Sequence, residues 1–357
     1  MQENKTVKIK TLDIDMASII SKNSAENLKA FLRRIDLPFE ETWGKDLLAL
    51  TLKEAILEHT EYVLYIHSME SLLFLTELWD FDEMEISRAD WALIGQLQLL
   101  GFLDYNMNKD PNQEGYVYLS KEAKDAFYFY LKSKRARQEM ERYELWERLI
   151  RGMMTYYGII SFNRLYLYLC KCLKSPVDDR EFHKFLAARV SLWSFGSLVL
   201  EKNSGIEYYE NFEVTDPEKI LDVCESHKEM DYWKLDLDDA LYVADNNGFG
   251  QWKGIPELAD IFMDQLNIEY YQTVVILKSC ILLIQNGDSS EKVLENIMKW
   301  CLDASSYREE IYKTVKMLYL SVPVYELKGW SRKEQKDHFI NNKNLFTVLK
   351  GGKPKKK

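Results

Sequence analysis

The sequence predicts a mainly α-helical, multi-domain protein with small β-hairpins, in which tandem winged-helix-like units are followed by a helical block. Three observations support this fold class. Residues 142–209 contain three amphipathic segments and then two extended runs, the element order of a winged helix. A similar order of helices and strands comes earlier in the chain. Beyond residue 216 the apolar residues follow helical spacing, and 357 residues suffice for two or three domains.

The sequence of the N-terminal region predicts a flexible arm that is followed by a small helical module. Residues 1–20 are expected to form a flexible, poorly anchored arm. Within residues 21–66, Ser24 caps a first helix, Pro38 ends it, and a leucine-rich second helix follows. Two short helices with a lysine opening the second resemble the Rho-N module of the Rho termination factor and its SAP-like relatives. This resemblance implies a module that often contacts nucleic acid.

The first winged-helix-like unit is predicted over residues 67–138. From Ser68 the pattern is helix, acidic loop and helix, and then two period-two runs on either side of a polar loop. Ser120 is placed to cap the helix that follows. The second of these helices is mostly apolar, so we expect it to pack in the core.

The second winged-helix-like unit is predicted over residues 139–215. A long amphipathic helix comes first, and Ser161 is placed to cap the next one. A third helix precedes the extended runs SLVLEK and GIEYY, which a short Asn-Ser-Gly turn joins in a hairpin. Asp178 and Asp179 at the start of the third helix suit the helix dipole but oppose a phosphate backbone. The pattern therefore favours protein docking over DNA reading.

The remaining chain predicts an acidic helical block over residues 216–345 and a lysine-rich tail over residues 346–357. The net charge is −10, and residues 213–269 hold 15 acids and 4 bases. Residues 343–357 hold six lysines and no acid, and the tail is expected to be disordered. Such a charge distribution repels nucleic acid unless a local basic patch overrides it.

Basic residues in two segments are the candidates for contact with an anion or a nucleic acid. Residues 132–151 form a positive run in which spacing pairs Glu144 with Arg148 and Glu147 with Arg151. The candidates are the basic residues at the start of this run, which lack such a partner, and those of the third helix of the second unit. They are Lys132, Lys134, Arg135, Arg137, Arg180, Lys184 and Arg189.

Composition and motifs give no sign of a cofactor, a metal or a membrane span. The first residues lack the apolar core of a signal peptide, and no apolar run reaches the ~20 residues of a membrane helix. Five scattered cysteines indicate reduced thiols in a cytoplasm. Cys170 and Cys172 point apart if they lie on a helix, so they cannot share a metal. The loop around Gly248 lacks the carboxylates of a calcium loop.

The helical block ends in a segment that carries a family resemblance. Ile284-Gln285-Asn286-Gly287 is followed by Pro323, Leu327-Lys328-Gly329, Ser331 and Glu334. These residues resemble the helical part of bacterial proteins that carry a SEC-C motif. The zinc-binding SEC-C knuckle itself is missing, because no cysteine follows Cys301, so no metal role carries over. The resemblance implies a cytoplasmic bacterial protein, and the spacing of Ser331 and Glu334 predicts a capping box.

These patterns predict a non-enzymatic protein-interaction or regulatory protein that docks partners through its winged units and its acidic block. The alternative is a nucleic-acid-associated regulator that uses the winged-helix and basic segments. An enzyme whose active site is assembled from distant residues stays open as a third hypothesis. The partner and the oligomeric state are not defined by the sequence.

Overall fold

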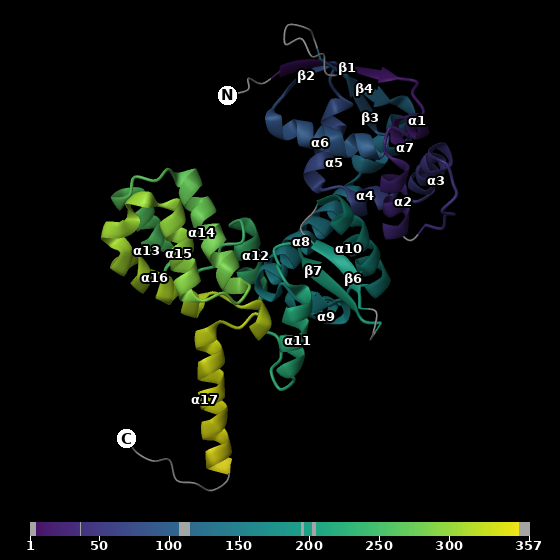
Figure 1. Cartoon of the computed structure of the whole chain (residues 1–357). Coiled ribbons are helices and arrows are strands. Elements are labelled where there is room, and N and C mark those ends of the chain that lie inside the picture. The colour runs from purple at the N-terminus through teal and green to yellow at the C-terminus, as the bar shows by residue number, and fades with distance from the viewer. Residues whose placement is uncertain (1–4, 36, 107–114, 194–195, 202–204, 350–357) are drawn as a thin grey trace. The chain divides into compact units, whose positions relative to one another are not determined.

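A computed structural model describes residues 5–35, 37–106, 115–193, 196–201 and 205–349. The predicted mainly helical class with small β elements is confirmed, because the described residues are mainly helical and carry two small sheets (Figure 1). The chain divides into two compact units. Unit 1 comprises residues 1–147 and 177–194, and unit 2 comprises residues 148–176 and 195–357. None of the described helices has the apolar length that crossing a bilayer requires.

Unit 1 is a set of helices whose starts are fixed by side-chain caps. Ser24, Ser68, Ser87 and Ser120 each accept a hydrogen bond from the backbone N–H three residues on, as the sequence predicts for Ser24 and Ser120. The helices are α1 (Met16–Ile20), α2 (Ala25–Arg34), α3 (Lys45–Glu58), α4 (Glu61–Ile66), α5 (Met69–Leu78), α6 (Arg88–Leu99), α7 (Lys121–Leu131), the first part of α8 (Lys134–Tyr157) and α10 (Asp179–Trp193).

The four-stranded sheet of unit 1 has the order β2-β1-β4-β3. Strands β3 and β4 form the predicted antiparallel pair, with Leu103 opposite Leu119; the loop predicted between them lies outside the described residues. Strand β1 runs parallel to β4 and antiparallel to β2. The strands are β1 (Lys5–Leu12), β2 (Glu83–Ile86), β3 (Leu103–Asn106) and β4 (Gly115–Ser120).

The structure corrects two expectations about unit 1. The described part of the expected arm, residues 5–20, is not loose, because β1 lies in the sheet with Val7 and Ile9 buried, and α1 buries Met16 and Ile20. The expected acidic loop after α5 contains strand β2. Both errors have one cause: the hydrogen-bond partners of β1 are β2 and β4, which are distant in the sequence.

Unit 2 begins with the end of α8 and a three-stranded sheet of order β5-β7-β6. Strands β6 and β7 form the predicted antiparallel hairpin, with Leu198 opposite Tyr209. The helix expected to pack with this hairpin, α10, belongs to unit 1, so residues 139–215 are divided between the two units. The strands are β5 (Ile159–Ser161), β6 (Gly196–Leu200) and β7 (Glu207–Asn211).

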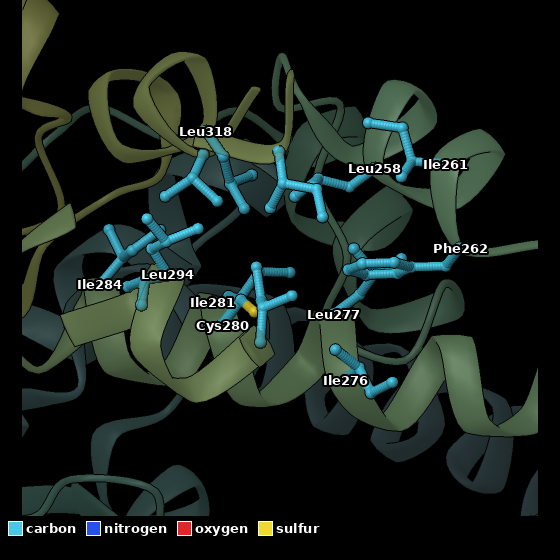
Figure 2. Close-up of a cluster of buried hydrophobic side chains, with 14 of the residues drawn as sticks. Leu258, Ile261, Phe262, Ile276, Leu277, Cys280, Ile281, Ile284, Leu294 and Leu318 are labelled. Carbon is cyan, nitrogen blue, oxygen red and sulfur yellow. The ribbon is translucent and has the colours of Figure 1, made fainter. Parts of the chain in front are cut away.

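Helices make up the rest of unit 2. A core of apolar side chains joins α13, η1, α14, α15 and α16, and Figure 2 shows Leu258, Phe262 and Leu277 within it. The helices are α9 (Phe162–Leu173), α11 (Pro217–Ser226), α12 (Leu237–Asp245), α13 (Ile255–Asp260), the π-helix η1 (Ile261–Gln265), α14 (Tyr270–Gln285), α15 (Ser290–Trp300), the 3₁₀-helix η2 (Leu302–Tyr307), α16 (Arg308–Ser321), the 3₁₀-helix η3 (Tyr325–Leu327) and α17 (Arg332–Leu349).

Candidate docking groove

The basic residues predicted at the end of α7 and the start of α8 are partly neutralised by carboxylates. Lys132 Nζ lies 2.5 Å from an oxygen of Asp80, and Arg137 forms an ion pair with Glu141 at 3.6 Å. Lys134 and Arg135 are exposed on α8. The run therefore presents less free positive charge than its composition suggests.

The candidate residues on α10 do not share one surface. Arg180 and Lys184 are exposed, and Lys184 lies over the ring of Tyr62. Arg189 is 2% exposed, and its guanidinium faces Glu147 at 3.4 Å and donates to the carbonyl oxygen of Leu64 at 3.1 Å. The prediction that Arg189 contacts a nucleic acid is wrong, because the helical period places it on the buried face of α10.

The two segments that carry the family resemblance meet inside unit 2. Tyr325 is fully buried, and its hydroxyl donates to Gln285 Oε1 at 3.2 Å. Gln285 Nε2 in turn donates to the carbonyl oxygen of Thr155 at 2.7 Å. The side chains of the two segments thus satisfy each other's buried polar groups, which is a structural role.

The Leu-Lys-Gly turn is also held by polar contacts in the interior. Lys328 adopts a left-handed backbone conformation, and its buried ammonium donates to the carbonyl oxygens of His227 and Met230 at 2.7 and 2.8 Å. Burial lowers the pKa of this lysine. Ser331 and Glu334 exchange side-chain and backbone hydrogen bonds, so the predicted capping box is confirmed.

A cavity of about 630 Å³ lies between the α12–α13 loop and the first turns of α14. Its walls include the aromatic side chains of Tyr242, Phe249, Trp252 and Tyr270. The glycine at position 250 lets the backbone approach the indole of Trp252, because a Cβ there would lie 2.4 Å from the ring. We call this cavity the aromatic pocket.

A second cavity of about 510 Å³ continues along α14 and has a mainly aliphatic lining. Val275, Leu282 and Leu283 line it, and Lys278 crosses it to pair with Glu213 at 3.0 Å. We call this cavity the aliphatic pocket. The two pockets adjoin each other, because Asn247, Phe249 and Val274 line both, and we call the pair the groove.

The resemblance segment at the end of α14 shapes one rim of the groove. Asn286 lines the aliphatic pocket, and its side-chain oxygen accepts hydrogen bonds from the backbone N–H of Thr215 at 2.8 Å and from its hydroxyl at 3.0 Å. Its amide nitrogen donates to the carbonyl oxygen of Glu213 at 3.0 Å. These bonds fix the loop before α11 and position the carboxylate that pairs with Lys278.

The groove exists because α14 is apolar on more than one face. Ile276, Cys280 and Ile284 face the core shown in Figure 2. Val275 lies on another face and is 40% exposed, and Tyr270 is exposed at the start of the helix. A helix that is apolar all round is normally covered on all sides. The apolar composition of α14 is therefore the sequence signal for this surface.

Four carboxylates line the two pockets, and three of them have a cationic partner: Asp245 pairs with Arg148, Glu213 with Lys278 and Asp288 with Lys292. Residues 236–269 contain eight acids and one base, Lys253, and all eight acids are exposed. Among the described residues, only Asp245 of these eight forms an ion pair, with Arg148. Partial burial and the neighbouring charges of Asp236 and Asp238 raise the pKa of Asp239. Residues 236–269, which contribute most of the aromatic pocket, thus carry an excess of exposed negative charge, and such a segment attracts a positively charged partner.

A third cavity bears on the hypothesis of an enzyme. It holds Glu291, Glu295 and Glu309 beside Tyr312. Hydrogen bonds from its own backbone N–H and from Tyr312 lower the pKa of Glu291, and a hydrogen bond from Lys313 lowers that of Glu309. These shifts favour the ionised forms of Glu291 and Glu309, which is the opposite of the raised pKa that a general acid at neutral pH needs.

Where the chain is described, no cluster of three or more His, Cys, Asp or Glu side chains is arranged to hold a metal ion. Comparisons with protein-family models, with curated proteins and with solved structures find no match to this chain.

Proposed function

We propose that this chain is a protein-interaction protein whose groove along α14 binds a segment of a partner protein. The observation that carries the proposal is a pair of adjoining pockets, apolar along α14, beside a segment with an excess of exposed acids. Burial of apolar side chains in such a groove gives about 25 cal/mol per Å². The surrounding charge selects a partner that carries basic residues beside its apolar anchors.

The resemblance segments contribute to the groove, and a relationship to SEC-C-associated proteins is part of this proposal. The hydrogen bond between Tyr325 and Gln285 makes the two segments one unit, and Asn286 of that unit lines the groove. A cytoplasmic location is part of the same proposal. All five cysteines are free, and four of them are buried, which suits a reducing compartment.

The alternative, a nucleic-acid-associated regulator, receives less support from the placement of the charges. Arg189 is buried, Lys132 and Arg137 pair with carboxylates, and the groove is acidic. Titration of the full chain with mixed DNA and RNA at two salt concentrations separates the two functions. We expect the chain to bind neither DNA nor RNA even at low salt, whereas tight binding that weakens steeply as the salt concentration rises would favour the alternative.

A selection experiment tests docking with random peptides in place of the partner. Peptides from a displayed library are selected on the full chain and then measured on two variants. Val275→Arg places a long cationic side chain in the aliphatic pocket at an exposed helical position. Met317→Arg on α16 is the matched control, because Met317 is equally exposed and lies outside the groove.

We expect the selected peptides to be rich in Lys and Arg and to bind the wild-type chain and the Met317→Arg variant equally. Val275→Arg should weaken their binding by at least about tenfold. Peptides that bind all three proteins equally would show that the groove is not the docking site.

A further inference from the structure

The lining of the aromatic pocket contains a buried hydroxyl that has no hydrogen-bond partner. Thr273 lines the pocket, and only 2% of this residue is exposed. Among the described residues, its Oγ1 has neither a donor nor an acceptor within hydrogen-bond distance. Buried polar groups are nearly always paired, because an unpaired group has lost its water without compensation. This hydroxyl is therefore suited to pair with an atom that a ligand brings into the pocket.

Other helical threonines of the chain satisfy their hydroxyls within their own helix. Thr51, Thr155 and Thr314 each donate to the carbonyl oxygen four residues back, at 2.9, 3.0 and 3.0 Å. The hydroxyl of Thr273 does not make this bond to the carbonyl oxygen of Glu269. Rotation about χ1 can thus turn the hydroxyl towards an occupant without breaking a hydrogen bond. Such changes of side-chain rotamer are common when an interface forms.

The rest of the lining favours a flat apolar group. Beside Thr273, its most buried side chains are those of Trp252 and Leu277, whereas the rings of Tyr242 and Tyr270 are exposed. Aromatic rings stabilise a further ring that packs against them in an edge-to-face or offset arrangement. An aromatic side chain of a partner would therefore gain more in this pocket than an aliphatic one.

The charges of the lining favour a neutral occupant. Asp245 pairs with Arg148, and Glu257 is an exposed residue whose carboxylate accepts the Gly254 N–H at 3.1 Å. The buried residues of the lining carry no charge. A charged group placed among them would lose its water without gaining a partner of opposite charge. The exposed acids of the segment can instead attract basic residues that flank a neutral anchor.

On the premise of the proposed docking function, we infer that the aromatic pocket receives a tyrosine side chain of the partner, whose hydroxyl bonds to the hydroxyl of Thr273. Tyrosine carries its hydroxyl at the end of the ring farthest from the backbone. The ring can therefore contact the aromatic walls while the hydroxyl reaches the buried part of the lining. Phenylalanine lacks the hydroxyl, and the N–H of tryptophan lies on the side of its ring. Tyrosine is also enriched among the residues that dominate binding energy at interfaces.

The first test varies the anchor in the peptides that are selected on the full chain by display. We expect these peptides to share a tyrosine. In synthetic copies, phenylalanine replaces this tyrosine and keeps the ring, and alanine removes both the ring and the hydroxyl. The phenylalanine peptide should bind about fivefold more weakly than the tyrosine peptide, because one hydrogen bond is lost. The alanine peptide should bind more weakly still.

A protein variant assigns the effect of the hydroxyl to Thr273. Thr273→Val removes the hydroxyl and keeps the shape of the side chain, so this variant should bind the tyrosine and phenylalanine peptides equally. Its stability in urea unfolding should not fall, because the hydroxyl makes no hydrogen bond in the unbound chain. Thr314→Val is the control, since Thr314 is a buried threonine outside both pockets. This variant should keep the full preference for tyrosine.

The outcomes separate this inference from the proposed function. If the selected peptides share no tyrosine, or if phenylalanine replaces it without loss, the tyrosine anchor is refuted, and the docking function stands as long as Val275→Arg weakens binding. If Val275→Arg leaves binding unchanged, the groove itself is refuted. A preference for tyrosine that persists in Thr273→Val, or that is lost equally in Thr314→Val, would overturn the role of Thr273.

Discussion

The interior of unit 1 and the groove of unit 2 distribute charge and apolar surface in opposite ways. Unit 1 buries Arg189, Glu147 and His67 among aromatic side chains. Unit 2 leaves aliphatic residues of α14 at the surface, and its residues 236–269 carry eight exposed acids. Buried charges are costly and stabilise only one arrangement of their neighbours, whereas exposed apolar surface contributes little to folding. The difference indicates that the buried charges of unit 1 hold its interior in one arrangement, whereas the groove is suited to contact with a partner.

The largest expected effect is on the stability of unit 1. Arg189→Met removes the cation that faces Glu147 in the interior, and we expect the free energy of unfolding to fall by about 3 kcal/mol. Urea titration followed by circular dichroism measures it. The double variant Glu147→Leu with Arg189→Met should recover much of the loss, because it leaves no buried charge. Equal stability of the wild-type chain and Arg189→Met would contradict a constraining role for the pair.

The next effect is a dependence of stability on pH that arises in unit 1. Burial and the charge of Arg189 lower the pKa of His67 from 6.5 to about 3 in the folded chain, and both ring nitrogens lack a hydrogen-bond partner among the described residues. The unfolded chain therefore binds a proton that the folded chain does not. The contribution of His67 to stability should be fully present above pH 6.5. As the pH drops towards 3, this contribution should lower the free energy of unfolding by up to ~1.4 kcal/mol per pH unit.

Thermal unfolding of the wild-type chain and of His67→Leu between pH 7 and pH 4 isolates this contribution, because other titrating groups are common to both. We expect the melting temperature of His67→Leu to fall less with acidification. Parallel curves for the two proteins would rule out a contribution from His67.

A smaller loss of stability is expected at the junction of the two resemblance segments, where Tyr325 contacts Gln285. Tyr325→Phe removes the hydroxyl that donates to Gln285 Oε1 and leaves a buried acceptor without that bond. The loss should be about 1 kcal/mol in urea unfolding. Tyr271→Phe on α14 is the comparison, since Tyr271 is 76% exposed. A larger loss in Tyr271→Phe would contradict a special role for the junction.

The smallest effect on folding is expected in the groove. Val275→Ser exchanges an exposed valine for a residue of similar helix propensity, so the free energy of unfolding should change by less than about 0.5 kcal/mol. Binding of selected peptides should nevertheless weaken, because the aliphatic pocket loses apolar surface. Unfolding and binding are measured on the same preparation. A large loss of stability would show that Val275 serves the core and not a partner.

Features that depend on neighbouring residues could be predicted from the sequence. The caps at Ser24 and Ser120, the capping box at Ser331 and the hairpin of β6 and β7 all follow from local spacing. Ser161 is correctly placed as an N-cap, but its side chain makes no capping hydrogen bond. Local geometry limits each of these features to a few arrangements, so a short pattern is enough to indicate it.

Features that join distant residues could not be predicted in this way. Strand β1 gains its partners only when β2 and β4 fold beside it, so its residues read as an arm in isolation. The basic residues of α10 were indistinguishable by type, yet packing buries Arg189 and exposes Arg180. The groove was missed because its walls come from a loop, a helix and a segment near Glu213.

The sequence alone determined the helical class, the positions of the helix starts and the uneven charge, because these depend on composition and on contacts within a few residues. The tertiary structure decided which charges are buried, which strands pair across long separations and where α14 leaves apolar surface uncovered. Those outcomes depend on contacts between segments that are distant in the sequence. The free energy of such packing belongs to the whole set of contacts, so it cannot be derived from any one segment.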